Sequence, residues 1–209
     1  ETVVWKGEFS MNIKESFCSI YNNHIVREGS QALLSWLLES DFFTAPASTK
    51  YHGAHEGGLV EHSLHVYNRL RRLCIAEYGE VKDMEPIAIC GLLHDLCKTS
   101  FYAVSTRNVK NEKTGLWEKQ PYYTVTDKFP LGHGEKSVFL IERFLRLTPK
   151  EALAIRWHMG GFDDAAKGYA LTGAYEQCPL ALLLHMADMM ATYLDEGKTE
   201  MDGGILCWK

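Results

Sequence analysis

The sequence predicts a single, mainly α-helical domain with one β-hairpin inserted in it. Most of its 209 residues show the 3.6-residue spacing of apolar side chains that is typical of amphipathic helices. Residues 99–130 break this pattern and are rich in aromatic and β-branched residues, which favours paired strands. The length suits one domain with a full core, so we expect one domain over residues 1–209, with 1–11 as an upstream extension.

Local signals mark where the helices begin and end. Ser30 is the expected N-cap of the second helix, and Thr148 with Glu151 predicts a capping box at the start of a later one. Gly79 ends the long third helix, and the pair Gly160-Gly161 follows the helix that reaches His158. The next segment is a loop holding Phe162, Asp163 and Asp164. The expected helices cover about 12–26, 30–38, 59–78, 83–95, a stretch from 134, 149–158 and 179–194.

The insert at about 99–130 is expected to be a hairpin of strands 101–109 and 122–126, joined by a long loop. Pro121 predicts an edge position or a bulge, because proline cannot donate to a strand ladder. The insert carries a net charge of +2, so the rest of the chain carries −7. Its basic residues are Arg107, Lys110, Lys113, Lys119 and Lys128, and its acidic ones are Glu112, Glu118 and Asp127.

Charge and cysteine content narrow the class of protein. The net charge of −5 argues against a protein that binds long nucleic acid mainly through charge, but it leaves room for a local basic patch. There is no run of apolar residues long enough to span a bilayer and no signal peptide, so the expected location is the cytoplasm. None of the six cysteines forms a C-x-x-C pair, and Cys90 and Cys97 are expected to be buried, reduced side chains.

The pair His94-Asp95 points most directly to chemistry, because it ends a run of apolar helical residues. His62 shares the apolar stripe of its own helix, and Asp188 lies among leucines and methionines. A buried carboxylate costs several kcal/mol unless it is paired or binds a cation. Taken singly, His62 could be a packed core residue and Asp188 could face solvent beside an arginine. Together the four side chains predict a divalent metal site made by three helices.

This order of residues, H…HD…D, resembles the HD superfamily of metal-dependent phosphohydrolases over about residues 57–194. The similar segments are GGLVEH ending at His62, GLLHDLCK containing His94-Asp95, and HMAD ending at Asp188. The resemblance implies that His62, His94, Asp95 and Asp188 bind the metal. The hairpin and the Leu-Gly-His segment also resemble the HD domain of bacterial 3′→5′ exoribonucleases, but this chain has no room for their oligonucleotide-binding barrel. A nucleotide or the end of a short oligonucleotide is therefore expected.

Two further histidines could extend the site. By the same resemblance, His133 and His158 are candidate ligands of a second ion. With one ion only, both would serve as acid–base groups or phosphate contacts. The two-metal members often have His-His where this chain has Trp157-His158, so the sequence leaves the number of ions open.

Other residues are candidates for substrate binding and catalysis. Lys98 follows Asp95 by one helical turn, and the resemblance implies a phosphate contact, although a lysine there could also interact with the helix C-terminus. His52 and His55 lie in the irregular segment before Gly57, where a loop at the mouth of the site is expected. His65, one turn after His62, could contact substrate or an ordered water. The expected catalytic residues are Asp95, Lys98, His133 and His158.

The predicted activity is hydrolysis of a phosphate ester by metal-activated water, as a phosphomonoesterase or a phosphodiesterase. The nitrogen and oxygen donors suit one or two ions of Fe, Mn, Co, Ni, Zn or Mg. Two alternatives remain open at this stage. One is a di-iron HD oxygenase, which would need both His133 and His158 as ligands. The other is a non-catalytic HD signalling or binding module. The oligomeric state is not predicted.

Overall fold

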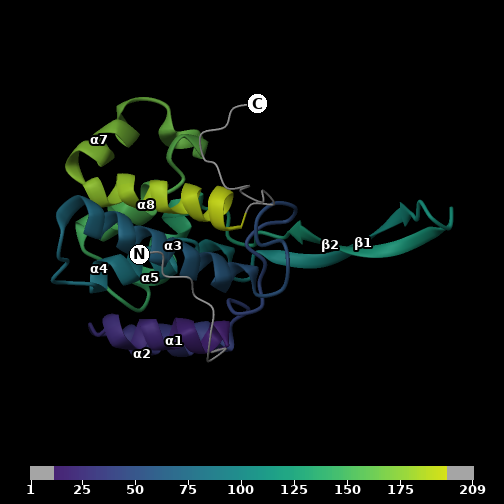
Figure 1. Cartoon of the computed structure of the whole chain (residues 1–209), viewed down its shortest axis with the longest axis horizontal. Helices are drawn as coiled ribbons and strands as arrows, with labels where there is room; N and C mark the ends of the chain where they lie inside the picture. Colours follow the sequence, from purple (N-terminus) through teal and green to yellow (C-terminus); the bar gives the residue numbers. More distant parts are fainter. Residues whose placement is uncertain (1–11, 197–209) are drawn as a thin grey trace, which may run out of the picture.

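The computed structural model describes residues 12–196, so the predicted extension at 1–11 lies outside the described residues. The described part is a bundle of eight α-helices with a two-stranded antiparallel hairpin that projects from one end (Figure 1). The predicted fold class is therefore confirmed. The elements are α1 (Ile13–His24), α2 (Ser30–Glu39), α3 (Gly58–Tyr78), α4 (Glu85–Leu93), β1 (Tyr102–Lys110), β2 (Trp117–Val125), α5 (His133–Glu142), α6 (Pro149–Trp157), α7 (Tyr169–Gln177) and α8 (Pro179–Met190).

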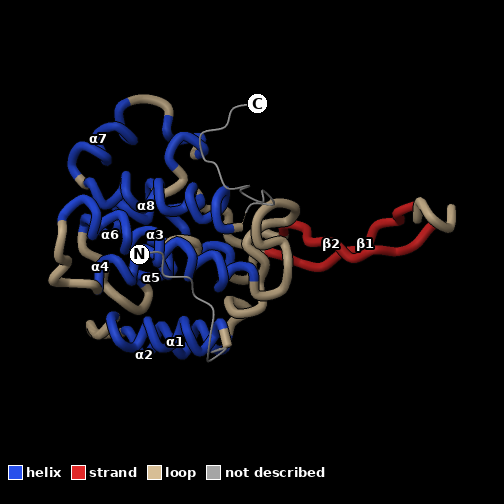
Figure 2. Tube along the Cα trace, in the orientation of Figure 1, coloured by secondary structure: helices blue, strands red, loops and turns tan. Residues whose placement is uncertain are grey.

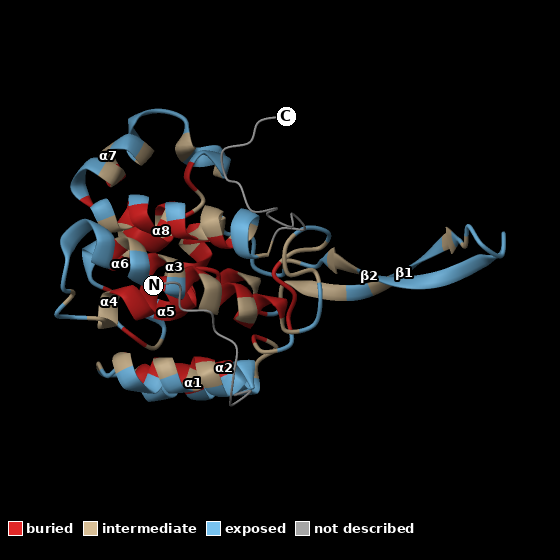
Figure 3. Ribbon diagram, viewed as in Figure 1, coloured by how far each residue is buried: buried red, intermediate tan, exposed pale blue. Residues whose placement is uncertain are grey.

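The helix α3 lies at the centre of the bundle and packs against α4 and α8. The helix α6 packs against α4, α5 and α8, and closes the other side of the core. Figure 3 shows that the burial concentrates on the facing sides of these helices, whereas the hairpin is exposed or half-buried. The apolar stripe of α3 is buried as its spacing predicts, with Leu59, Val66 and Leu70 fully inaccessible. None of the described helices is both long and apolar enough to cross a membrane.

The predicted helix starts are partly right. Thr148 caps α6, and its hydroxyl accepts a hydrogen bond from Glu151 N–H while the Glu151 carboxylate accepts from Thr148 N–H, so the predicted capping box is confirmed. Ser30 is not an N-cap, and this prediction is wrong. The N-cap of α2 is Gly29, whose φ is +88° and whose Cβ, if present, would meet the Phe144 carbonyl oxygen. A residue with a side chain is excluded at position 29, and Ser30 is the first residue of α2, so the helix starts one position earlier than predicted.

Two glycines let pairs of helices approach closely enough to bring site residues together. A Cβ on Gly91 in α4 would lie 2.6 Å from Tyr67 Cα in α3, and a Cβ on Gly134 in α5 would lie 2.1 Å from the Arg156 carbonyl oxygen in α6. Real Cβ atoms do not tolerate such distances, so larger residues would push these helices apart. The first contact sets the spacing of the α3 and α4 histidines, and the second sets that of the α5 and α6 histidines.

The hairpin differs from its prediction in length and turn. Its strands pair in register from Tyr102 with Val125 to Lys110 with Trp117, so the predicted long loop is wrong. The turn is short and is held by the side chain of Asn111, which accepts hydrogen bonds from the N–H groups of Lys113 and Thr114. Residues 117–121 combine Trp117 and Pro121 with three polar residues and lack a strand pattern of their own, and they become a strand by pairing with β1. Figure 2 shows this ribbon extending away from the helices. Pro121 pairs with Thr106 in a strand that has one free edge, so the predicted edge position is confirmed.

Two features near the C-terminal side of the bundle were not predicted. The helix α7 forms where the sequence pattern indicates only a loop, and it packs on α6 and α8. The predicted last helix, 179–194, is a regular α-helix only to Met190, and a π-helical turn (Ala191–Asp195) follows it. The helix α8 is also less buried than predicted, because Leu182 and Met186 are about two-fifths exposed. π-Helical turns are frequent at functional sites, and this one directs Glu196 toward α3.

Candidate metal centre

The structure brings together the four residues that the sequence assigns to a metal site. His62 comes from α3, His94 and Asp95 follow the end of α4, and Asp188 comes from α8. Nε2 of His62 lies 3.3 Å from Nε2 of His94, 3.2 Å from Asp188 Oδ1 and 3.6 Å from Asp95 Oδ2. Nε2 of His94 is also 3.6 Å from Asp95 Oδ2. The side chains of His62, His94 and Asp95 are almost fully buried, and that of Asp188 is nearly so.

Three buried histidines present Nε2 to the centre, because an acceptor behind each ring holds Nδ1. The Gly91 carbonyl lies 3.0 Å from Nδ1 of His94, and the Ile155 carbonyl lies 2.6 Å from Nδ1 of His158. A carbonyl oxygen only accepts, so Nδ1 carries the proton and the neutral ring keeps its lone pair on Nε2. For His62 the acceptor behind Nδ1 is the Glu196 carboxylate at 3.0 Å. Such acceptors orient metal-binding imidazoles.

The electrostatics of the centre favour a cation. Burial lowers the pKa of His94 to about 3, so this ring is neutral at pH 7. Burial alone would also lower the pKa of His62, but its hydrogen bonds to Asp188 and Glu196 raise it to about 9. A proton on His62 Nε2 therefore balances the Asp188 carboxylate in the metal-free protein. A divalent ion placed among these atoms would replace that proton, as metal binding to histidine and carboxylate sites commonly does.

Asp95 lies between two groups of donors. Its Oδ2 faces His62 and His94, whereas its Oδ1 lies 2.6 Å from Nε2 of His133 and 3.4 Å from Nε2 of His158. Burial would raise the pKa of the Asp95 carboxyl group, but the Lys98 ammonium at 2.6 Å and the neighbouring histidines hold it well below its usual range. Asp95 is thus an anion with one oxygen toward each group.

Two observations indicate that these donor atoms can bind a metal ion. Atoms that bind one first-row cation at about 2.1 Å lie roughly 3.0–3.4 Å apart, close to the separations among His62, His94 and Asp188. In addition, Nε2 of His158 is buried and, although Asp95 Oδ1 lies 3.4 Å away, it makes no well-aligned hydrogen bond among residues 12–196. An unpaired buried nitrogen of this kind is costly unless something binds it. His62, His94 and Asp95 can hold one ion, and Asp95, His133 and His158 offer donors for a second. His94, His158 and Asp188 form a further group that overlaps both.

A cavity of about 800 Å³ opens directly over this centre. Asp95, Asp188 and His133 lie at its inner end, and Lys98 and His52 line it beside them. It is also lined by aromatic and thioether side chains, which can hold a flat, partly apolar group. These are Tyr51, Tyr102, Met159, Phe162, Met189 and Tyr193.

The predicted substrate residues divide into two groups. Lys98 and His52 line the cavity, whereas His55 and His65 are not among its lining residues. His55 instead pairs with Glu61 at 3.2 Å on the surface, because the loop turns its ring outward. Nδ1 of His65 lies 2.9 Å from the Glu196 carboxylate, behind the metal centre. Of the four, the structure therefore places only Lys98 and His52 in the lining of the cavity.

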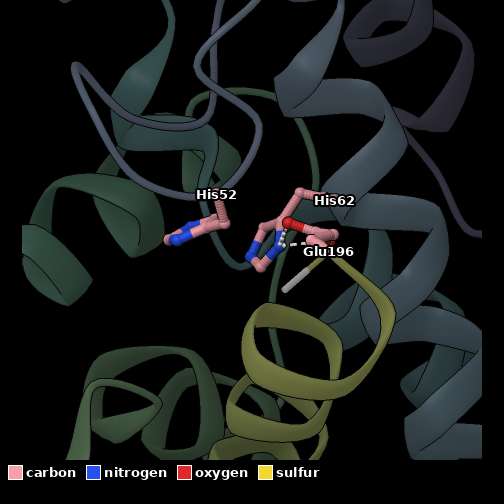
Figure 4. Close-up of side chains that lie close together, drawn as sticks. All are labelled: His52, His62 and Glu196. Atoms are coloured by element: carbon pink, nitrogen blue, oxygen red, sulfur yellow. Dashed lines mark hydrogen bonds and ion pairs between the residues drawn. The ribbon is translucent and has the colours of Figure 1, made fainter. Parts of the chain in front are cut away.

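Glu196 is the residue of this centre that the sequence analysis missed. Figure 4 shows Glu196 beside one side of the His62 ring, with His52 on the other side. Its carboxylate accepts from both His62 and His65, which lie one helical turn apart on α3. The spacing of the sequence gives no signal for it, because a π-helical turn separates Glu196 from Asp188. The aromatic lining of the cavity gave no signal either.

The comparisons with known proteins agree with this geometry. The family model described as the HD domain matches residues 59–193, well over half of the chain. The matched segment contains His62, the His94-Asp95 pair and Asp188. The chain belongs to the HD domain family. No curated protein and no solved structure matched it.

Proposed function

We propose that the protein is a metal-dependent phosphohydrolase that acts on a phosphate ester of a nucleotide or of the end of a short oligonucleotide. HD domains generally belong to metal-dependent hydrolases. The observation that carries the proposal is the Asp95 carboxylate, which is buried among four imidazoles at the inner end of an open cavity. A fold that needed only stability would not place so many polar groups together beside solvent.

The residues that would hold the metal are His62, His94, Asp95 and Asp188, with Asp95, His133 and His158 for a second ion. A divalent cation there would lower the pKa of a coordinated water and polarise the phosphoryl oxygens. Fe, Mn, Co, Ni, Zn and Mg are all compatible with nitrogen and oxygen donors.

The surrounding side chains supply the rest of the chemistry. The Lys98 ammonium faces the cavity beside Asp95 and would neutralise a phosphoryl oxygen of the substrate. His133 also faces the cavity, so with one ion bound it is the residue placed to give a proton to the leaving oxygen. With two ions bound, it would serve as a ligand instead.

The shape of the cavity supports a nucleotide as the substrate. Its volume of about 800 Å³ exceeds that needed for a phosphate group alone. Tyr51, Phe162 and Tyr193 line the cavity with flat aromatic surfaces on which a base could stack. A lining that combines the polar groups of the metal centre with aromatic side chains matches the two halves of a nucleotide.

The test is a substrate panel with the metal-reconstituted protein. It comprises aryl phosphate mono- and diesters, nucleoside mono-, di- and triphosphates, and short oligonucleotides, each with and without a chelator. We expect phosphate or nucleotide release that a chelator abolishes and that Asp95→Asn reduces at least 100-fold, with the helical content unchanged by circular dichroism. Hydrolysis that survives in Asp95→Asn would contradict the mechanism. Oxygen consumption by the iron-loaded protein in place of hydrolysis would favour the oxygenase, and metal binding with neither activity would favour a binding module.

A further inference from the structure

The β-hairpin is the largest feature that the proposed chemistry leaves without a role. Figure 2 shows β1 and β2 leaving the helical body together. Neither of these described strands contains a buried residue. Nine paired residues per strand correspond to an arm of about 30 Å, and a two-stranded ribbon that packs on nothing is marginally stable in water. An exposed arm of this length indicates a surface for a binding partner.

One of the two faces of the ribbon continues into the lining of the cavity. Residues directly opposed across an antiparallel pair share a face, and successive residues along a strand alternate between faces. The opposed pair Tyr102 and Val125 lines the cavity above the metal centre. We call the face that continues from this pair the cavity face, and it consists of the even-numbered residues of β1 and the odd-numbered residues of β2.

The cavity face is positively charged. In the described hairpin it carries Lys110 and Lys119 and no carboxylate. Each acidic residue of the insert is placed elsewhere. Glu112 lies in the turn, Glu118 lies on the opposite face, and Asp127 follows β2 and pairs with Lys136 at 2.6 Å. The chain as a whole has a net charge of −5, so this face stands out as a place for an anion.

The same face carries aromatic and apolar side chains, of which Trp117 and Val104 are exposed and Tyr123 is half-buried. Trp117 is 70% exposed and lies opposite Lys110 near the end of the arm. Tyr123 lies nearer the cavity, opposite Val104, which is 66% exposed. Alternation of flat aromatic rings with cationic groups is the arrangement that binds single-stranded nucleic acid, in which bases stack and phosphates pair with lysine.

We propose that the cavity face binds a single-stranded oligonucleotide whose terminal nucleotide enters the cavity. This inference rests on the proposed function and names its substrate class. The phosphates would pair with Lys119 and Lys110, and bases would stack on Tyr123 and Trp117. An oligonucleotide strand is flexible enough to follow the twist of the ribbon, and several nucleotides would fit along it. A second copy of the chain is the other possible occupant, but the positive charge of the face favours a polyanion.

The experiment measures binding separately from hydrolysis. Fluorescence anisotropy of labelled, cleavage-resistant phosphorothioate dT12 and U12 is recorded with the full chain at several salt concentrations. Three proteins are compared with the wild type. They are Lys110→Gln/Lys119→Gln, Trp117→Ala, and a matched control, Arg107→Gln/Lys113→Gln, which removes the same charge from the arm away from the cavity face. Light scattering gives the mass of each protein in solution.

We expect the wild type to bind at least one of the two oligomers. The Lys110→Gln/Lys119→Gln variant should reduce the slope of log K against log salt by about 1.4, and Trp117→Ala should weaken binding about fivefold or more. The control should retain most of the affinity and slope. Absence of binding by the wild type, or equal losses in both double variants, overturns the proposal. A lower mass for Trp117→Ala with unchanged affinity overturns it in favour of an arm that joins two copies. If binding follows the expected pattern but the substrate panel shows no hydrolysis, the proposed function fails and the assignment of the binding face is retained.

Discussion

Oε1 of Glu196 lies 3.0 Å from Nδ1 of His62, although 134 residues separate the two in sequence. The Nε2 atom of the same ring points into the metal centre, so Glu196 fixes both the tautomer and the orientation of the ring from behind. Burial would raise the pKa of the Glu196 carboxyl group, but His62 and His65 lower it to about 2, so the carboxylate is ionised at neutral pH. An ionised acceptor behind an imidazole makes the ring a better ligand.

We therefore predict that Glu196→Ala weakens metal binding about 10- to 100-fold, the range found when such supporting partners are removed. Titration calorimetry with Mn²⁺ or Zn²⁺ measures the effect. The matched control is Asp195→Asn, which removes the neighbouring carboxylate that pairs with Arg69. Equal affinities for the wild type and Glu196→Ala would show that His62 does not need this support.

Replacement of Lys98 should lower the turnover of substrate and leave metal binding unchanged. Burial alone would lower its pKa, but the Asp95 carboxylate keeps it above its ordinary value, so the ammonium stays charged at neutral pH. We predict that Lys98→Met lowers kcat/KM for a phosphate ester roughly 10- to 100-fold while the bound metal is retained, and that Lys98→Arg recovers part of the loss. Steady-state kinetics and metal analysis check this together. A loss of metal in parallel with the activity would point to a structural role.

The close contact of α3 with α4 can be tested at Gly91. We predict that Gly91→Ala lowers the free energy of unfolding by roughly 1–3 kcal/mol and weakens metal binding, because the new methyl group would collide with Tyr67 and separate His62 from His94. The control is Gly173→Ala in α7, where a Cβ meets nothing within 4 Å and where alanine should stabilise the helix by about 0.5–1 kcal/mol. Chemical unfolding measures both, and a neutral Gly91→Ala would contradict the packing argument.

The acid stability of the fold should depend on Glu85. Burial would raise its pKa, but the N–H groups of Arg27 and Val26 at 2.9 and 2.7 Å and the Arg27 guanidinium lower it below its ordinary value of 4.5. A carboxyl group with a lowered folded-state pKa stabilises the protein above that ordinary value and loses its contribution as the pH falls through the folded value. We predict that Glu85→Gln is less stable at pH 7 and that its stability falls less steeply below pH 4.5. Urea unfolding at several pH values, with the exposed Glu112→Gln as control, measures this.

The helical bundle and the candidate ligands could be predicted from the sequence because their signals are local. A helix that buries an unpaired His or Asp stands out in the pattern of its own residues, as His62 and Asp188 do. Whether these residues bind metal stays a prediction until an ion is measured. The number of ions stays open as well, although the structure places His133 and His158 on one side of Asp95.

The features that were missed depend on contacts between distant segments. The strand at 117–121 forms through pairing with β1, and α7 is held by α6 and α8 rather than by a strong periodic pattern. Glu196 reaches His62 only because a π-helical turn interrupts the last helix, which no periodicity shows. His55 was predicted to lie at the site because its loop was expected at the mouth of the cavity. Its ring instead pairs with Glu61 on the surface.

Metal content is the most direct test of the central claim, that side chains from three helices share a cation. Elemental analysis of the protein, loaded with Mn²⁺ or Zn²⁺ and freed of excess ion, is compared with that of Asp188→Ala and of His133→Ala. We predict one or two ions per chain in the wild type and a loss of at least one ion in Asp188→Ala. If two are bound, His133→Ala should keep one. A wild type without metal, or an Asp188→Ala protein with the full content, would contradict the account.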